Sequence, residues 1–151
     1  MKTLFVDTSA WLAVVDNTDT YHRVAKHYYL GSIKRKASLV TSSDLLTETY
    51  TRLRYTTGHR DAVRFHGMIE MAQQQGFLRV VWVDEEIAAE AWDLFERYDD
   101  QLFSFQDCTS FVIARRLDSQ DVFAFDEDFS VMGFRVWPRQ GARGVDRDLT
   151  K

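Results

Sequence analysis

Apolar residues recur along the chain in two patterns, which predict strands that alternate with helices. Short β-branched or aromatic runs predict five strands, at residues 3–6, 39–41, 78–83, 122–125 and 134–137. Helical spacing of apolar residues predicts helices at residues 9–14, 20–30, 43–55, 60–75 and 104–117, and one more after Asp84. This alternation is typical of an α/β fold with a mostly parallel sheet that is covered on both faces.

Length and composition fit one such domain. The 151 residues are 45% hydrophobic and 28% charged, which excludes disorder, collagen and coiled coil. We expect a domain over residues 1–138 and a flexible tail over 139–151, because the only proline, Pro138, precedes a stretch of glycine, arginine and aspartate. The longest apolar run, residues 10–15, is too short for a membrane span or a secretory signal. With a single cysteine, Cys108, the chain is expected to be cytoplasmic and not to bind membranes.

The charged residues narrow the possible chemistry further. Residues 37–150 contain no lysine, so this stretch offers neither a P-loop lysine nor a Schiff-base lysine. The net charge of −4 argues against passive binding to a polyanion unless a cation is added at the contact.

Four acidic residues occupy positions where a parallel sheet binds ligands, beyond the carboxyl ends of its strands. Asp7 and Asp126 each follow an apolar strand, whereas Glu48 and Asp107 lie on helices. Each has a structural explanation as well. Asp7 and Asp126 can cap the helices that follow them, Glu48 can pair with Arg52, and Asp107 can form a capping box with a serine three residues earlier.

As a group, the four acids suggest a metal site. The helical residues next to Glu48 and Asp107 are expected to be buried, and uncompensated carboxylates near a core are costly. A hard divalent cation such as Mg²⁺ or Mn²⁺, which prefers oxygen ligands, would neutralise them. The four charges also equal the net charge of −4, so the acidic balance of the chain is accounted for by this one group.

Four stretches that contain these acids resemble the PIN-domain ribonucleases, in particular the VapC-type toxins of bacterial and archaeal toxin–antitoxin pairs. The stretches are FVDTSA at 5–10, TSSDLLTE at 41–48, SFQDC at 104–108 and FDEDF at 125–129. The segment GFRVWP at 133–138 is similar to the end of many such chains. The resemblance covers about residues 3–138, with the motifs in the family's order.

This resemblance implies a three-layer α/β/α domain whose sheet has about five strands in the order 3-2-1-4-5. It implies that Asp7, Glu48, Asp107 and Asp126 are the metal-binding and catalytic acids, with one or two Mg²⁺ or Mn²⁺ ions. Thr8 or Ser9 would place a hydroxyl near the metal or its water. Asp128 would support the site from beside the ligands, and its alternative is an ordinary acid in the first turn of a helix.

The activity implied is that of an endoribonuclease. The ions would bind the scissile phosphate, activate water and stabilise the leaving 3′ oxygen, so no protein nucleophile is needed. Family resemblance implies products with a 5′-phosphate and a 3′-hydroxyl. It also implies a homodimer that is silenced by a small antitoxin.

Arginines supply candidate contacts to RNA phosphate. They are Arg52, Arg54, Arg60 and Arg64, around one helix–helix connection, and Arg115, which follows Asp107. The alternative is a solvated helix face or surface ion pairing. The aromatic residues Tyr50, Tyr55 and Phe65 lie among the first four and can either stack on unpaired bases or form a groove for a partner helix.

Two other acidic α/β folds conflict with the sequence. A haloacid-dehalogenase phosphatase needs an aspartate where the chain has Ser9, and both this class and a response-regulator receiver need a lysine that is absent here. One alternative stays open, a PIN-like module without catalysis that binds RNA or protein. A housekeeping nuclease is also an alternative to a toxin.

Overall fold

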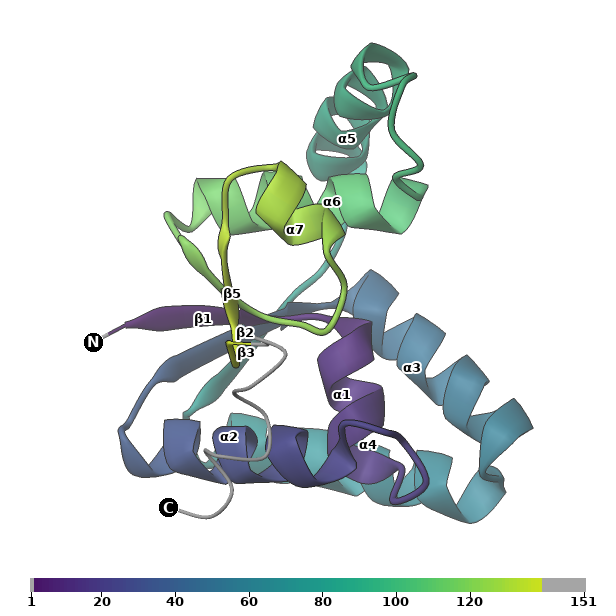
Figure 1. Ribbon diagram of the computed structural model, residues 1–151, viewed down its shortest axis with the longest axis vertical. Helices are drawn as coiled ribbons and strands as arrows, with labels where there is room; N and C mark the ends of the chain where they lie inside the picture. The colour runs from purple at the N-terminus through teal and green to yellow at the C-terminus, as the bar shows by residue number, and fades with distance from the viewer. Residues whose placement is uncertain (1, 140–151) are drawn as a thin grey trace.

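The computed structural model describes residues 2–139 of the chain. Strands and helices alternate in the order β1 Thr3–Val6, α1 Thr8–Val15, α2 His22–Lys34, β2 Ser38–Ser42, α3 Ser43–Thr56, α4 His59–Gln74, β3 Leu78–Val81, α5 Glu85–Arg97, α6 Phe105–Arg116, β4 Asp121–Phe123, α7 Asp128–Val131 and β5 Arg135–Trp137 (Figure 1). All but the first residue of the tail expected over 139–151 lies outside the described residues. No helix within residues 2–139 combines the length and apolar character needed to cross a membrane.

The five strands form one sheet in the order β3-β2-β1-β4-β5, and every neighbouring pair is parallel. This confirms the expected α/β class and strand order. The central strand β1 pairs with β2 on one side and β4 on the other, so that Phe5 lies opposite both Val40 and Val122. All three of these side chains are buried, as expected for parallel strands covered on both faces.

Helices cover both faces of the sheet and make three layers (Figure 1). Helices α1, α2 and α4 lie on one face, and α5, α6 and α7 on the other. The first face packs a core around Trp11, whose indole N–H donates to the Thr41 hydroxyl at 3.0 Å. The second core is centred on Phe111 and Phe129, which pack edge to face. Each cluster buries large aromatic area, which supplies much of the stabilisation of such layers.

One aromatic prediction is wrong as far as base stacking is concerned. Phe65 on α4 is only 1% exposed and packs edge to face against Trp11 in the first core, with ring centroids 5.6 Å apart. A nucleobase therefore cannot reach its ring.

Polar contacts move the ends of several elements away from the expected positions. The helix expected at 20–30 begins at His22, because Asp19 holds a turn by accepting the Tyr21 N–H on its side chain at 2.8 Å. The strand expected at 78–83 ends at Val81, since the Val83 N–H donates to the Ser43 hydroxyl at 3.0 Å instead of to a strand. The apolar pattern does not predict α7, whose four residues are too few to show a helical period, and only the possible capping role of Asp126 indicated a helix there.

Candidate active site

The candidate site lies at the carboxyl edge of the sheet, where β1 and β4 run side by side. Because the two strands are parallel neighbours, Asp7 after β1 and Asp126 after β4 emerge at the same edge. Strand order reverses here, since the chain continues from β1 to β2 on one side and reaches β4 on the other. Open α/β sheets bind ligands at such a point.

Asp7 is a buried carboxylate that also caps α1. Its side chain is the N-cap, accepting the Ser9 N–H at 3.1 Å and the Ser9 hydroxyl at 2.7 Å. Burial raises the pKa of Asp7 to about 6. The two hydrogen bonds from Ser9 lower this pKa, whereas repulsion from Asp107 and Asp126 raises it further. Asp7 therefore does cap the helix, as its structural explanation predicted. Its carboxylate is nevertheless a buried charge, which a bound cation would stabilise.

The two hydroxyls next to Asp7 point to different partners. The Ser9 hydroxyl donates to Asp7, and its oxygen accepts the Phe125 N–H at 2.9 Å. Ser9 therefore connects the start of α1 to the loop after β4. The Thr8 hydroxyl donates to the Leu45 carbonyl of α3 at 3.0 Å and serves the packing of α1 on α3. Of the two candidates, Ser9 is the one that contacts a candidate ligand.

Three further carboxylates converge beside Asp7. Asp107, Asp126 and Asp128 each place an oxygen within 4.8 Å of the others, and all three are half-buried. Asp107 completes the expected capping box, since it accepts the Ser104 N–H at 2.9 Å and its own N–H donates to the Ser104 hydroxyl at 3.0 Å. Asp126 accepts the Asp128 N–H at 2.9 Å. Local hydrogen bonds thus fix the direction of two of the three carboxylates.

The geometry gives Asp128 a more central place than the sequence indicated. Burial and repulsion from Asp126 and Asp107 raise its pKa to about 7. Its oxygen belongs to the converging group, whereas the sequence placed it beside the ligands. The signal that could have found it is the two-residue spacing from Asp126, which lets a short turn aim both carboxylates at one point.

Glu48 faces the same acids from α3. Burial raises its pKa, the Arg52 guanidinium lowers it, and the charges of Asp107 and Asp126 raise it again. The Arg52 nitrogen lies 3.9 Å from the Glu48 carboxylate, one turn along the helix. The expected ion pair is therefore present, and Glu48 is still close enough to the other acids to be repelled by them.

The candidate RNA contacts are exposed but dispersed. Arg52, Arg54, Arg60, Arg64 and Arg115 all have exposed side chains, and Arg64 also pairs with Asp61 at 3.8 Å. Tyr55 is 84% exposed, whereas the Tyr50 hydroxyl lies 2.8 Å from His66 Nδ1. Both the RNA contact and the solvated face are compatible with this arrangement.

Sequence reasoning passed over one further buried acid, Asp121, at the start of β4. It accepts two bonds from Arg135 at 3.0 Å and one from the Trp137 indole at 2.7 Å, and Lys2 lies 3.4 Å away. These bonds, led by that from Arg135, lower the pKa of Asp121 to about 2 despite its burial. Because Asp121 is fully paired and lies at the amino end of β4, its role is to hold the sheet together.

A parallel sheet of this order, with carboxylates gathered at the reversal of strand order, defines an acidic α/β domain with a candidate metal site. Residues 4–135 match the family model of the PIN domain, and the chain belongs to the PIN-domain family.

Within this family, the chain is a homologue of the VapC endoribonucleases. It is 35% identical over 131 residues to the 23S rRNA-specific endonuclease VapC20 of Mycobacterium tuberculosis, covering 87% of this chain and 95% of that protein. The crystal structure of M. tuberculosis VapC20, described as a Sarcin-Ricin loop cleaving toxin, matches with a TM-score of 0.77 and 36% identity over 87% of this chain and 95% of that one. DNA-bound VapBC from Salmonella typhimurium shares the fold, with a TM-score of 0.52 and 15% identity over 90% of this chain and 97% of that one.

Proposed function

We propose that the chain is a metal-dependent endoribonuclease that hydrolyses RNA phosphodiester bonds and serves as the toxin of a toxin–antitoxin pair. The observation that carries the proposal is the convergence of Asp107, Asp126 and Asp128 beside the buried Asp7. The similarity to VapC20 along 87% of the chain supports the choice of RNA as substrate.

The donor set fits a hard divalent cation. Asp7, Glu48, Asp107 and Asp126 would hold one or two Mg²⁺ or Mn²⁺ ions, and the geometry adds Asp128 as a fifth candidate. These ions prefer carboxylate oxygens, and their charge would offset the burial and the mutual repulsion that raise the pKa values of Asp7 and Asp128. When bound, the metal supplies positive charge that activates water and stabilises the leaving 3′ oxygen.

The chain's own residues orient the acids and leave the attack to water. Ser9 fixes Asp7, Ser104 fixes Asp107, and the Asp128 N–H fixes Asp126. Neither the serine nor the cysteine beside these acids is suited to act as the nucleophile. The Ser9 oxygen is engaged on both sides, because its hydroxyl donates to Asp7 and it accepts the Phe125 N–H. Burial raises the pKa of the Cys108 thiol to about 11, and that residue is fully buried.

We extend the proposal to partners that the family resemblance implies, namely a small antitoxin and a second copy of the chain, in the cytoplasm. Large apolar side chains exposed outside the acidic site support such interfaces. Trp82 is 76% exposed and Leu102 is fully exposed. Tryptophan in particular is enriched at protein interfaces relative to the rest of the surface.

The test is cleavage of single-stranded RNA by the purified protein with Mn²⁺, with Mg²⁺ and with a chelator. We expect cleavage only with metal and its near loss in Asp107→Asn, with a 5′-phosphate on the product. Asp99→Asn, on an exposed loop away from the site, is the matched control and should cleave normally. RNA binding without cleavage by the wild type would favour the alternative of an inactive PIN-like binding module.

The position of Asp128 can be tested in the same assay by single-turnover cleavage at saturating Mn²⁺. If it supports the ligands from beside them, Asp128→Asn reduces the rate by about 10- to 100-fold. A larger loss would place it among the ligands. A rate for Asp126→Asn equal to that of the wild type would remove Asp126 from the site.

A further inference from the structure

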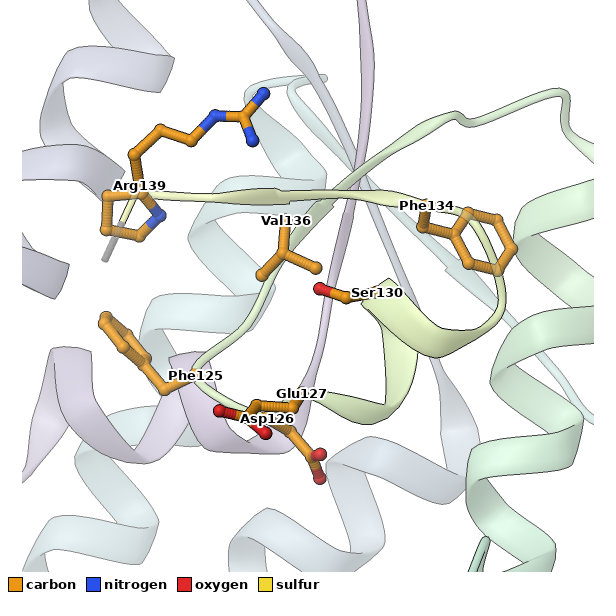
Figure 2. A pocket seen from close by; sticks show the side chains of 8 residues that line it. Phe125, Asp126, Glu127, Ser130, Phe134, Val136 and Arg139 are labelled. Atoms are coloured by element: carbon orange, nitrogen blue, oxygen red, sulfur yellow. The ribbon is translucent and has the colours of Figure 1, made fainter. Parts of the chain in front are cut away.

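A cavity of about 430 Å³ opens beside the converging acids, between the loop that follows β4 and the strand β5 (Figure 2). Asp126 lines it and also belongs to the acidic group, so the cavity and the proposed metal site share a wall. Val136 of β5 lies across from this loop, Ser130 of α7 lies between the two, and Pro138 is also part of the lining. A molecule in the cavity would therefore be next to the reacting phosphate.

Phe125 forms an aromatic wall of this cavity and is held firmly in place. Its backbone N–H donates to the Ser9 hydroxyl at 2.9 Å. Its ring stacks on Tyr21, with centroids 4.6 Å apart and planes 11° from parallel, and it meets the edge of Phe123 at 6.2 Å. The ring is only half-buried, so it has surface left to offer. A flat ring fixed by its neighbours loses little freedom when it binds another flat group.

The charged groups that face this cavity are carboxylates. Asp126 and Glu127 line it, and both repel a phosphate. Arg139 also lines the cavity, but its side chain runs to the other side of β5, where its guanidinium lies 4.5 Å from the centroid of the Trp137 ring (Figure 2). The cavity thus offers a nucleotide an aromatic wall for its base, and the binding of phosphate is left to the metal at the acids.

We propose that this cavity holds the unpaired nucleotide next to the scissile phosphate, with its base against Phe125. The inference rests on the proposed ribonuclease function. Proteins bind unpaired RNA bases by stacking on aromatic side chains, and the cavity volume lies within the range of small-molecule sites. Every base has a stacking face, so this contact would strengthen binding for all sequences.

The test separates KM from kcat in RNA cleavage at saturating Mn²⁺. Phe125→Leu keeps apolar bulk but removes the ring, so KM should rise by about 5- to 100-fold, with a smaller change in kcat. Phe125→Trp should restore KM. The matched control is Phe95→Leu on α5, an aromatic residue outside the cavity, which should leave KM unchanged. Equal Mn²⁺ thermal shifts in wild type and Phe125→Leu show that the fold and the metal site are intact.

A KM for Phe125→Leu within twofold of the wild type would overturn the assignment. A cavity that serves a partner peptide instead would give this unchanged KM.

Failure of the proposed function is distinguishable from failure of the subsite. If the wild type does not cleave RNA, the ribonuclease proposal fails, and the subsite is tested by binding of the same RNA to Asp107→Asn with and without Phe125→Leu. Weaker binding by the double variant would support the nucleotide site. Equal binding, or no binding by either variant, would refute it.

Discussion

At the scale of the residue, Asp7 shows how one side chain serves both fold and chemistry. The same carboxylate caps α1 and lies 6% exposed beside two other acids. Its cap bonds come from Ser9 alone, and they do not offset the cost of burying the charge, because the pKa of Asp7 is still raised to about 6. The metal-free protein is therefore less stable than its fold allows, which is typical of functional sites.

The first prediction is that Asp7→Asn stabilises the metal-free protein at pH 7.5. The folded pKa of about 6 lies above the ordinary value of 3.8, so the folded state binds more protons between these values. Stability from this group is therefore greatest below pH 4, falls as pH rises to about 6, and stays lower above it by about 3 kcal/mol. Urea unfolding in chelator should show a gain at pH 7.5 that is absent at pH 4.

With Mn²⁺ the wild type should become more stable than Asp7→Asn. Metal bound to the folded wild type stabilises it by mass action, and the variant should lose most of that gain. Equal thermal shifts with Mn²⁺ in the two proteins would count against Asp7 as a ligand.

At this scale the sequence singles out candidate acids but does not say how they are arranged. Asp7, Glu48, Asp107 and Asp126 stand out by motif and by their place after strands or on helices. The central place of Asp128 depends on a two-residue turn, and the pairing of Asp121 depends on Arg135, fourteen residues away. The two-residue spacing of Asp126 and Asp128 is a local signal, whereas the contact between Asp121 and Arg135 has no local pattern that a sequence could reveal.

At the scale of the element, the edge strand β5 is held by Asp121. Strand β5 is three residues long, and its pairing with β4 is reinforced by the hydrogen bonds from Arg135 and Trp137 to Asp121. Because Val136 of β5 lines the cavity beside the acids, these hydrogen bonds to Asp121 also position a wall of the proposed nucleotide site.

We predict that Asp121→Asn destabilises the protein in a pH-dependent way. Its folded pKa of about 2 lies below the ordinary 3.8, so the stability it contributes is complete above about pH 4 and is lost as pH falls toward 2. The variant should be less stable by about 2 kcal/mol at pH 7, and the gap should narrow to about 1 kcal/mol at pH 3. Urea unfolding at pH 7 and at pH 3 measures this difference in the free energy of unfolding. An equal difference at the two pH values would contradict the ion pair.

The elements themselves were predictable because their apolar periods follow from burial on two faces. Their ends were not, since Asp19 and Ser43 form polar contacts that stop an element before its apolar pattern stops. The strand order came from the resemblance to a family, because apolar periodicity alone does not say which parallel strands are neighbours.

At the scale of the whole molecule, the acids of the site and the candidate RNA-binding arginines come from different elements, except that Arg52 pairs with Glu48 on α3. Carboxylates gather at the carboxyl edge of the sheet, whereas Arg52, Arg54, Arg60 and Arg64 are exposed on α3 and α4. With a net charge of −4, the chain repels RNA until cations reverse the field at the acids. The arginines are then left to position the strand through its phosphates.

Binding of single-stranded RNA should therefore require metal and weaken with salt. Replacement of the four arginines on α3 and α4 by alanine should lower affinity and flatten the salt slope by about 0.7 for each RNA phosphate that an arginine no longer binds. Stabilisation by Mn²⁺ is the internal control, since the acids are unchanged apart from the loss of the Arg52 pair with Glu48. Should the fourfold variant keep both its affinity and its slope, these arginines form a solvated face or a partner surface, and the RNA follows another path to the acids.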